Sequence, residues 1–190
     1  MKKLFLIPAR GGSKGLKNKN ILYFDNKPLI IYTLDAALNS AEKDDVICVS
    51  SDDEKIIKVV KDHGIDVPFV RPDEFSTDFS KVSDVIHHAL SWYKKKEINF
   101  DAVILLQPTS PLRKASHIKS ALEIWNNDIE MIASVKETDS NPYYVLFEED
   151  ENSYLVKSKK SKFSRRQDCP SVFELNGAIY LTKTSVLKNE

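Results

Sequence analysis

The segment IPARGGSKGLKNKNI, residues 7–21, combines glycines with cationic side chains directly after a short apolar run. Glycine has no Cβ, so the backbone N–H groups beside it can approach a phosphate closely, and a concave series of such groups binds anions. Arg10, Lys14 and Lys19 add positive charge, and an arginine can hold a phosphate through two hydrogen bonds. The segment therefore indicates an anion-binding loop, and phosphate binding is favoured over a merely solvated turn.

Two familiar phosphate-binding motifs differ from this loop in their spacing. For the motif G-x-x-x-x-G-K-[ST], Leu16 occupies the place of the second glycine and Lys17 follows it. The glycines also fail to match G-x-G-x-x-G, which is typical of dinucleotide-binding sites. The loop therefore supports neither a P-loop kinase nor a dinucleotide-binding site.

Three other segments carry polar side chains next to apolar runs. LQPTSPLR (106–113) follows a continuous apolar run, and its prolines stiffen a segment rich in hydrogen-bonding groups. RPDEFSTD (71–78) follows another run, and RRQ (165–167) leads into NGAIY (176–180). For 106–113, a rigid turn that caps the next helix is an equally good interpretation.

Short apolar runs alternate with longer segments of helical periodicity along most of the chain. We expect strands at 4–7, 46–50, 67–70, 102–106 and 131–135, and helices at 29–38, 82–93 and 115–125 and from a cap at Asp52 or Ser51 to Gly64. This order is typical of βαβ units and a parallel sheet, so we predict an α/β fold. Ligands of such sheets bind beyond the carboxyl ends of the strands, which is where the polar segments are expected.

The alternating pattern breaks in a polar and highly charged stretch, and we predict an excursion from the core at about 138–170. A strand at 143–147 with a short partner near Leu155 predicts a hairpin within it. FELNGAIYLT (173–182) then has the pattern of a returning strand. The chain is therefore predicted to be a single domain over 1–190 with one excursion.

Composition and charge argue against several classes of protein. The chain of 190 residues is 42% hydrophobic and has a formal net charge of zero, whereas dedicated nucleic-acid-binding proteins carry a basic excess, so no nucleic-acid partner is expected. No apolar run approaches the roughly 20 residues of a membrane helix, so no membrane partner is expected. Cys48 and Cys169 form neither a disulfide framework nor a zinc motif, which favours a reducing cytoplasm.

Five motifs occur together: IPARGGSKGLKNKNI, VSSDDE, RPDEFSTD, LLQPTSPLR and FELNGAIY. In register from residue 4 to about 182, they resemble the CMP-sialic acid synthetase family, the acylneuraminate cytidylyltransferases. The resemblance implies a Rossmann-like, three-layer nucleotidyltransferase domain with a mostly parallel sheet, and it makes 138–170 a dimerisation excursion. It further implies that CTP and a nonulosonic (sialic-type) acid react to form a CMP-sugar acid and pyrophosphate, with Mg²⁺ as the cofactor and a homodimer as the working state.

The resemblance also implies roles for individual residues. The residues expected in catalysis are Arg10, Lys14, Lys19 and Gln107. The cations among them would neutralise the charge that grows on the leaving pyrophosphate, usually the dominant electrostatic contribution. Nucleotide binding is expected from Ala9, Arg10, Gly11, Gly12, Ser13, Lys14, Gly15, Lys19, Asn20, Arg71, Ser80 and Ser83. Sugar-acid binding is expected from Gln107, Pro108, Thr109, Ser110, Arg166, Asn176 and Tyr180.

No side chain stands out as a covalent nucleophile. A direct attack of the sugar hydroxyl on phosphorus depends mainly on positioning and charge neutralisation. The four histidines fall on the expected helices, away from the strand ends, and we expect them to be surface or packing residues: His63, His87, His88 and His117.

Two features depart from the family pattern. Lys81 and Val82 stand where paired serines contact the nucleotide, and Ser80 and Ser83 are the candidates to replace those serines. An aspartate pair that holds the metal in the family is expected beyond Glu190, so the metal ligands are unknown.

Two alternatives stay open beside the sialic-type cytidylyltransferase. A nucleotide-binding module without turnover would follow from missing metal ligands; Asp52 is a spare carboxylate at a strand end, for which a helix cap is the favoured interpretation. A CMP-Kdo-type or other sugar nucleotidyltransferase would keep the fold and change the acceptor. Among nonulosonic acids, the sequence does not choose between N-acetylneuraminic, legionaminic and pseudaminic acid.

Overall fold

The computed structural model describes residues 1–12 and 15–187, which form two compact units. The core unit contains Met1–Ser134 and the chain from Gly177 onward, and the excursion unit contains Val135–Asn176. No helix in the described ranges is both long enough and apolar enough to cross a membrane.

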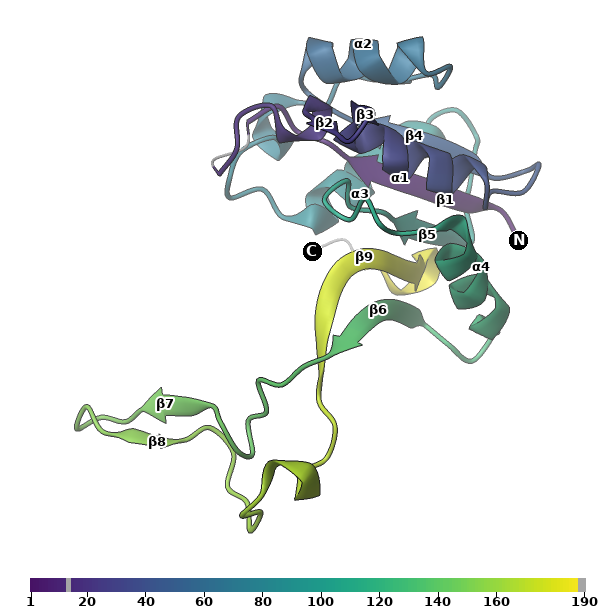
Figure 1. The fold of residues 1–190 in the computed structure, drawn as a ribbon. Coiled ribbons are helices and arrows are strands. Elements are labelled where there is room, and N and C mark those ends of the chain that lie inside the picture. Colours follow the sequence, from purple (N-terminus) through teal and green to yellow (C-terminus); the bar gives the residue numbers. More distant parts are fainter. Residues whose placement is uncertain (13–14, 188–190) are drawn as a thin grey trace. The chain divides into compact units, whose positions relative to one another are not determined.

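The central sheet has five strands in the order β4-β1-β5-β9-β6 (Figure 1). β1 (Lys3–Pro8) runs parallel to both of its neighbours, β4 (Val46–Ser50) and β5 (Ala102–Leu105). β9 (Phe173–Lys183) pairs with β5 in antiparallel register, and β6 (Met131–Glu137) forms the edge beyond it. β1 and β5 are buried on both faces, which explains their continuous apolar sequences. The predicted α/β fold is confirmed, and the returning strand makes the sheet mixed.

Three helices cover one face of this sheet. Because successive side chains of a strand point to opposite faces, Phe5 and Ile7 of β1 share one side, where they belong to the larger hydrophobic core. The helices that contribute to this core are α1 (Leu29–Leu38), α2 (Glu54–Asp62) and α4 (Ala115–Ile124).

Among the described residues, one helix covers the opposite face. Leu4 and Leu6 of β1 pack there with Cys48 of β4 and with Ala89 and other residues of α3 (Val82–Lys94). The core unit therefore has the predicted three layers, helices, sheet and helix, and α1 and α3 lie on opposite sides of β1 (Figure 1).

The predicted strand at 67–70 is wrong. Val70 makes an isolated parallel bridge with Ser51, and the rest of the run is irregular. Pro68 has no N–H group to donate to a strand ladder, which disfavours a regular strand here. The backbone N–H of Arg71 still donates to the Ser51 carbonyl at 2.7 Å, so the segment after this run stays at the edge of the sheet.

Helix α2 begins one residue later than predicted. Its cap is Asp53, whose Oδ1 accepts hydrogen bonds from the backbone N–H groups of Lys55 (2.7 Å) and Ile56 (3.1 Å). This corrects the expectation that Ser51 or Asp52 caps the helix. Gly64 ends it as predicted, with a φ of +85° that favours glycine.

Short elements complete the core unit. β2 (Tyr23–Phe24) and β3 (Lys27–Pro28) form a small antiparallel ladder directly before α1. The 3₁₀ helices in the described part of this unit are Lys19–Ile21, Asp73–Phe75 and Thr184–Val186, and Arg166–Asp168 forms another in the excursion unit.

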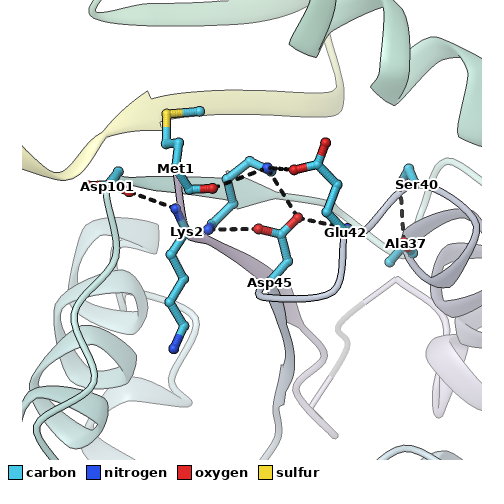
Figure 2. A network of polar contacts seen from close by, with 8 residues as sticks. Met1, Lys2, Ala37, Ser40, Glu42, Asp45 and Asp101 are labelled. Carbon is cyan, nitrogen blue, oxygen red and sulfur yellow. Dashed lines mark hydrogen bonds and ion pairs between the residues drawn. The ribbon is translucent and has the colours of Figure 1, made fainter.

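A polar network ties the amino end of β1 to the loop before β4 (Figure 2). The Lys3 Nζ lies 2.8 Å from a carboxylate oxygen of Glu42 and 3.2 Å from one of Asp45. Asp45 also accepts from the backbone N–H groups of Lys3 and Glu42, each at 2.9 Å. The Lys2 N–H donates to Asp101 at 2.6 Å, just before β5. The network thus anchors the amino ends of the strands, opposite the edge where ligands bind.

The excursion unit contains the antiparallel hairpin of β7 (Phe147–Glu149) and β8 (Leu155–Lys157). The partner strand lies where it is predicted, but the strand predicted at 143–147 begins only at its last residue. The buried Asn141 accepts hydrogen bonds at its carbonyl from the N–H groups of the following residues, which form a turn instead. All of the predicted excursion, 138–170, falls inside this unit.

Candidate functional site

A cavity of about 380 Å³ opens at the carboxyl ends of β1 and β5, the expected place for a ligand in this fold. Pro8 is the last residue of β1, and Gln107 follows β5 closely. The residues that line the cavity are Pro8, Arg10, Lys19, Asn20, Arg71, Phe75, Thr77, Asp78, Ser80, Lys81, Val82, Val85, Gln107, Pro108 and Thr109.

This cavity is strongly cationic. Four of its lining residues carry a positive charge, and Asp78 carries the one negative charge among them. A cleft lined mainly by one sign of charge concentrates ligands of the opposite sign. The arrangement therefore suits a polyanion such as a nucleoside triphosphate.

The structure brings eight predicted site residues into this lining: Arg10, Lys19, Asn20, Arg71, Ser80, Gln107, Pro108 and Thr109. Five other predicted residues of the core unit lie outside the lining: Ala9, Gly11, Ser83, Ser110 and Tyr180. Gly12 and Gly15, both solvent-exposed, also lie outside it. Ser13 and Lys14 lie outside the described residues.

Arg10 is bound to the loop that follows Arg71. Its Nη1 donates to the Thr77 carbonyl and its Nη2 to the Asp78 carboxylate, each at 2.7 Å. The Asn20 side-chain amide donates to the Arg10 carbonyl at 3.0 Å, which fixes the backbone behind the guanidinium. A cation that is predicted at the triphosphate is thus already bound by a carboxylate at the cavity wall.

Arg71 lies beneath this wall and is only 4% exposed. Its Nε donates to the Ser50 hydroxyl at 2.9 Å, and its Nη2 donates to the Ser50 carbonyl. Burial lowers the pKa of Arg71 to about 10, against the opposing effect of the Asp52 carboxylate. The side chain remains a cation at neutral pH and links the end of β4 to the cavity.

The glycine loop is arranged differently from the prediction. Ala9, predicted at the nucleotide, is fully buried in the core, and its N–H donates to the Ser50 carbonyl at 2.9 Å. The Gly11 N–H donates to Asp52 Oδ1 at 3.0 Å, so Asp52 caps this loop and not helix α2. A Cβ on Gly11 would lie 2.5 Å from Asp53 Oδ2. Glycine is required there by the close approach of α2's cap.

Of the two serines predicted to replace the family's nucleotide contacts, Ser80 lines the cavity and Ser83 does not. The Ser80 hydroxyl lines the cavity but also closes its own loop: it donates to the Glu74 carbonyl and accepts from the Thr77 N–H, each at 3.0 Å. Ser83 lies on α3 outside the lining. Lys81 and Val82, which replace the family's serines, both line the cavity.

Sequence reasoning missed three contributors within motifs that it had selected. Thr77 and Asp78, at the end of RPDEFSTD, hold Arg10. Arg113, the last residue of LQPTSPLR, is 6% exposed and donates to the Gln107 carbonyl at 3.1 Å. The charges of Asp78 and Arg113 could have signalled them, whereas neutral Thr77 uses its backbone carbonyl, which no side-chain pattern reveals.

Of the residues predicted at the sugar acid, Tyr180 of the core unit lies outside the cavity lining. Tyr180 of β9 pairs with Leu105 of β5 and packs against the hydrophobic core on the side of α3. Arg166 and Asn176 belong to the excursion unit. In that unit Arg166 forms an ion pair with Asp139 at a cavity of about 340 Å³.

The histidines lie away from the cavity lining, as predicted. His63 bonds to Asp35 at 2.8 Å, and the His117 ring accepts from the Lys114 N–H at 3.3 Å at the start of α4. The His88 ring packs edge-on against Phe69, with 4.7 Å between ring centroids, and burial lowers its pKa.

The described residues contain no preformed cluster of metal ligands. Among them, no group of three or more His, Cys, Asp and Glu side chains is placed to hold a metal ion. The single carboxylate of the cavity lining, Asp78, already binds Arg10. We therefore assign no chemical step to a metal held by these residues.

Comparison with known proteins points to one group. The chain is 36% identical to an N-acylneuraminate cytidylyltransferase of Streptococcus agalactiae, an alignment that covers 100% of this chain and 45% of that protein. It is 35% identical to a pseudaminic acid cytidylyltransferase of Campylobacter jejuni, over 95% of this chain and 78% of that one. It is 32% identical to a CMP-N,N'-diacetyllegionaminic acid synthase of Legionella pneumophila, over 100% and 82%. The chain thus spans about half the length of the first relative and about four fifths of the other two.

The fold has a close counterpart among solved structures. A CMP:2-keto-3-deoxy-manno-octonic acid synthetase complexed with CTP superposes with a TM-score of 0.71 at 19% identity, over 98% of this chain and 76% of that chain. At this identity the likeness concerns the fold alone. The family model described as cytidylyltransferase matches residues 4–188. With this match and these relatives, the chain belongs to the cytidylyltransferase family, as its resemblance to CMP-sialic acid synthetases predicts.

Proposed function

We propose that this protein transfers a CMP group from CTP to a nonulosonic acid and releases pyrophosphate. The observation that carries the proposal is the cationic cavity at the carboxyl ends of β1 and β5, where Arg10 and Lys19 of the first loop meet Gln107 of the second. Both loops belong to motifs shared with a family whose similar members are named for this reaction on sialic, pseudaminic and legionaminic acids.

The chemistry follows from the charges of this cavity. The anomeric hydroxyl oxygen of the acid forms a bond to the α-phosphorus of CTP, and the bond from that phosphorus to the pyrophosphate oxygen breaks. The hydroxyl proton leaves to solvent, and negative charge grows on the departing pyrophosphate. Arg10 and Lys19 are the lining cations of the first loop that would neutralise this charge. Lys14 is part of the proposal through its place in the family motif.

The acceptor is proposed as a nonulosonic acid without selecting one. Gln107, Pro108 and Thr109 form the part of the wall assigned to the acid. Arg166, through its charge, and Asn176, through its place in FELNGAIY, remain proposed contacts of the acid. The named acids of the relatives differ from one another, which supports the class. The eight-carbon acid Kdo is a less favoured acceptor.

Magnesium is proposed as the cofactor on chemical grounds. It is usually held through one or two carboxylates and the phosphates of the substrate. We expect pyrophosphate release to stop when EDTA removes divalent cations and to return when excess Mg²⁺ is added. Undiminished release in EDTA would remove the metal from the proposal.

We further propose a homodimer that works in the cytoplasm. The hairpin of the excursion unit exposes apolar side chains, among them Phe147, Leu155 and Val156, which a second copy would cover. Cys48 and Cys169 are both free thiols, as is usual in a reducing compartment. Sedimentation of the protein at micromolar concentration tests the dimer, and a monomer would contradict it.

The experiment that tests the function measures pyrophosphate release from CTP by the full-length protein with Mg²⁺. The panel of acceptors contains N-acetylneuraminic, pseudaminic and legionaminic acids, with Kdo as the competing candidate and UTP in place of CTP as the nucleotide control. We expect release with at least one nonulosonic acid. A thermal shift with CTP but no release with any acid would contradict the enzyme and favour a nucleotide-binding module.

A further inference from the structure

We propose that Arg113 and Gly177 are positioning residues that together hold Gln107. Arg113 binds the backbone carbonyl of Gln107, and Gly177 packs against the Gln107 side chain. We call this pair the Gln107 clamp. The inference rests on the proposed function, because that function places Gln107 at the sugar acid. The clamp would set the orientation of one wall of the cavity before the acid arrives.

Arg113 joins three segments of the core unit from within. Its Nη1 donates to the Gln107 carbonyl at 3.1 Å and to the Ala178 carbonyl of β9 at 2.8 Å. Its Nη2 donates to the Thr33 hydroxyl of α1 at 2.6 Å. One planar guanidinium thereby connects the loop after β5 to β9 and to α1.

The surroundings of Arg113 are unusual for a buried cation. The side chain is nearly inaccessible, its three hydrogen-bond partners named above are neutral oxygens, and its Nε is buried without a hydrogen bond. A buried charge without a carboxylate beside it is costly, and an apolar residue would fill the same space more cheaply. A role that needs the rigid fork of donors explains why arginine is used here.

Gly177 supports the same residue from the other side. Its φ is +71°, a conformation that side chains rarely adopt, and a Cβ built on it would lie 2.7 Å from Gln107 Oε1 and 3.4 Å from Gln107 Cδ. Gln107 therefore packs directly over the Gly177 backbone. Any other residue at 177 would push the glutamine amide out of its place.

The two contacts act on one residue from two directions. A free glutamine side chain loses rotamer entropy when a ligand orders it, and a small displacement of a group that positions a substrate can lower the rate by orders of magnitude. Because the clamp already orders the glutamine, little further rotamer entropy is lost when the acid binds. It predicts that disturbance of the clamp affects the acid and leaves CTP binding largely unchanged.

The test is a double-mutant cycle of Gly177→Ala, Gln107→Ala and the double variant, compared with wild type. We expect Gly177→Ala to lower kcat/KM for the acid by on the order of tenfold to a hundredfold, with the Kd for CTP within about twofold. Once Gln107 is alanine the added methyl group meets no amide, so Gly177→Ala should then cause little further loss. Independent, multiplying losses would overturn the clamp.

Gly64→Ala is the matched control. Gly64 also has a positive φ, +85°, but no atom lies within 4 Å of a Cβ placed there, and it is outside the cavity lining. The Gly64→Ala substitution should lower Tm through backbone strain and leave kcat/KM unchanged. Equal effects of the two glycine substitutions on kcat/KM would mean that strain, and not Gln107, explains the result.

Arg113→Lys tests the other half of the clamp. Lysine keeps the charge but cannot span the three acceptors with one ammonium group. We expect a higher KM for the acid and a lower kcat with CTP affinity retained. If this variant does not fold, the glycine cycle decides the question alone.

Failure of the clamp can be separated from failure of the proposed function. If wild type releases no pyrophosphate with any acid, the function fails, but thermal unfolding of wild type and the three variants of the cycle still reports on the contact. The loss of Tm caused by Gly177→Ala should be smaller when Gln107 is alanine, since the collision is then absent. An equal loss in both backgrounds would overturn the clamp.

Discussion

The Arg10 guanidinium is bound by the Asp78 carboxylate, with 2.7 Å between Nη2 and Oδ1. The two residues lie on loops far apart in sequence, and both line the cationic cavity. The cation that is predicted to meet the triphosphate is therefore already paired with a carboxylate. A phosphate that binds Arg10 has to compete with Asp78.

Removal of this competitor should strengthen nucleotide binding. We expect Asp78→Asn to lower the Kd for CTP by up to about fivefold, the equivalent of the ~1 kcal/mol of a partly exposed ion pair. Isothermal titration with CTP at low and high salt measures the effect, which should shrink as salt rises. Asp73→Asn removes the same charge from the same loop outside the lining and should leave Kd unchanged. Weaker binding by Asp78→Asn would show that the carboxylate helps the nucleotide.

Removal of the cation should have the opposite and larger effect. We expect Arg10→Ala to weaken CTP binding or slow turnover by on the order of a hundredfold, about 3 kcal/mol, as for the loss of one preorganised donor. Lys2→Ala, at the amino end of β1, is a control for the loss of one positive charge. Unchanged kinetics of Arg10→Ala would remove the phosphate role from the first loop.

Gly11 should tolerate no side chain, because α2's cap fills the space beside it. The Cβ of Gly11→Ala would lie 2.5 Å from Asp53 Oδ2 and 2.7 Å from Asp53 Cβ, and Asp53 cannot retreat without losing its bonds to the helix. We expect a loss of about 1–3 kcal/mol in the free energy of unfolding by urea. Gly12→Ala has no atom within 4 Å of its Cβ and should unfold at nearly the wild-type urea concentration. Equal stabilities of the two variants would refute the collision.

Asp45 should be essential for stability at the amino ends of the strands. Its side chain is 1% exposed and binds the Lys3 ammonium group at 3.2 Å as well as two backbone N–H groups. We expect Asp45→Ala to lower the free energy of unfolding by about 3–5 kcal/mol, because it leaves Lys3 buried with a weaker partner. The exposed neighbour Asp44→Ala should cost no more than about 0.5 kcal/mol. A similar cost for both aspartates would contradict the role of the network.

The same network should make stability fall at high pH. Burial lowers the pKa of Lys3, but its hydrogen bonds and charge interactions with Glu42 and Asp45 outweigh burial, so its pKa is raised above the ordinary value of 10.5. A pKa that is higher in the folded state stabilises the fold below the unfolded value, and this contribution is lost as pH rises through the folded value. We expect the free energy of unfolding to fall between about pH 10 and pH 12 more steeply in wild type than in Lys3→Met. Parallel pH profiles would contradict the shift.

The sequence by itself determined the fold class and the edge of the sheet where the site lies. Apolar runs buried on both faces can form only interior strands, and the helices between them require parallel neighbours, so LFLI and AVILL are recognisable as central strands. The motifs that follow these runs have to meet at their carboxyl ends. This is why Arg10 and Gln107, which follow these two runs, line one cavity, whereas Arg71 follows the irregular segment 67–70 and is assigned there only by the family resemblance.

Only the tertiary structure decided which partner each of these side chains has. The bond from Asp78 to Arg10, the carboxylate of Asp52 on Gly11 and the contact of Gly177 with Gln107 join segments that local periodicity treats as independent. The misplaced strand at 67–70 has the same cause, since edge pairing depends on which N–H groups face a neighbour. Local pattern reports the burial of a residue, whereas its hydrogen-bond partners depend on the packing of distant segments.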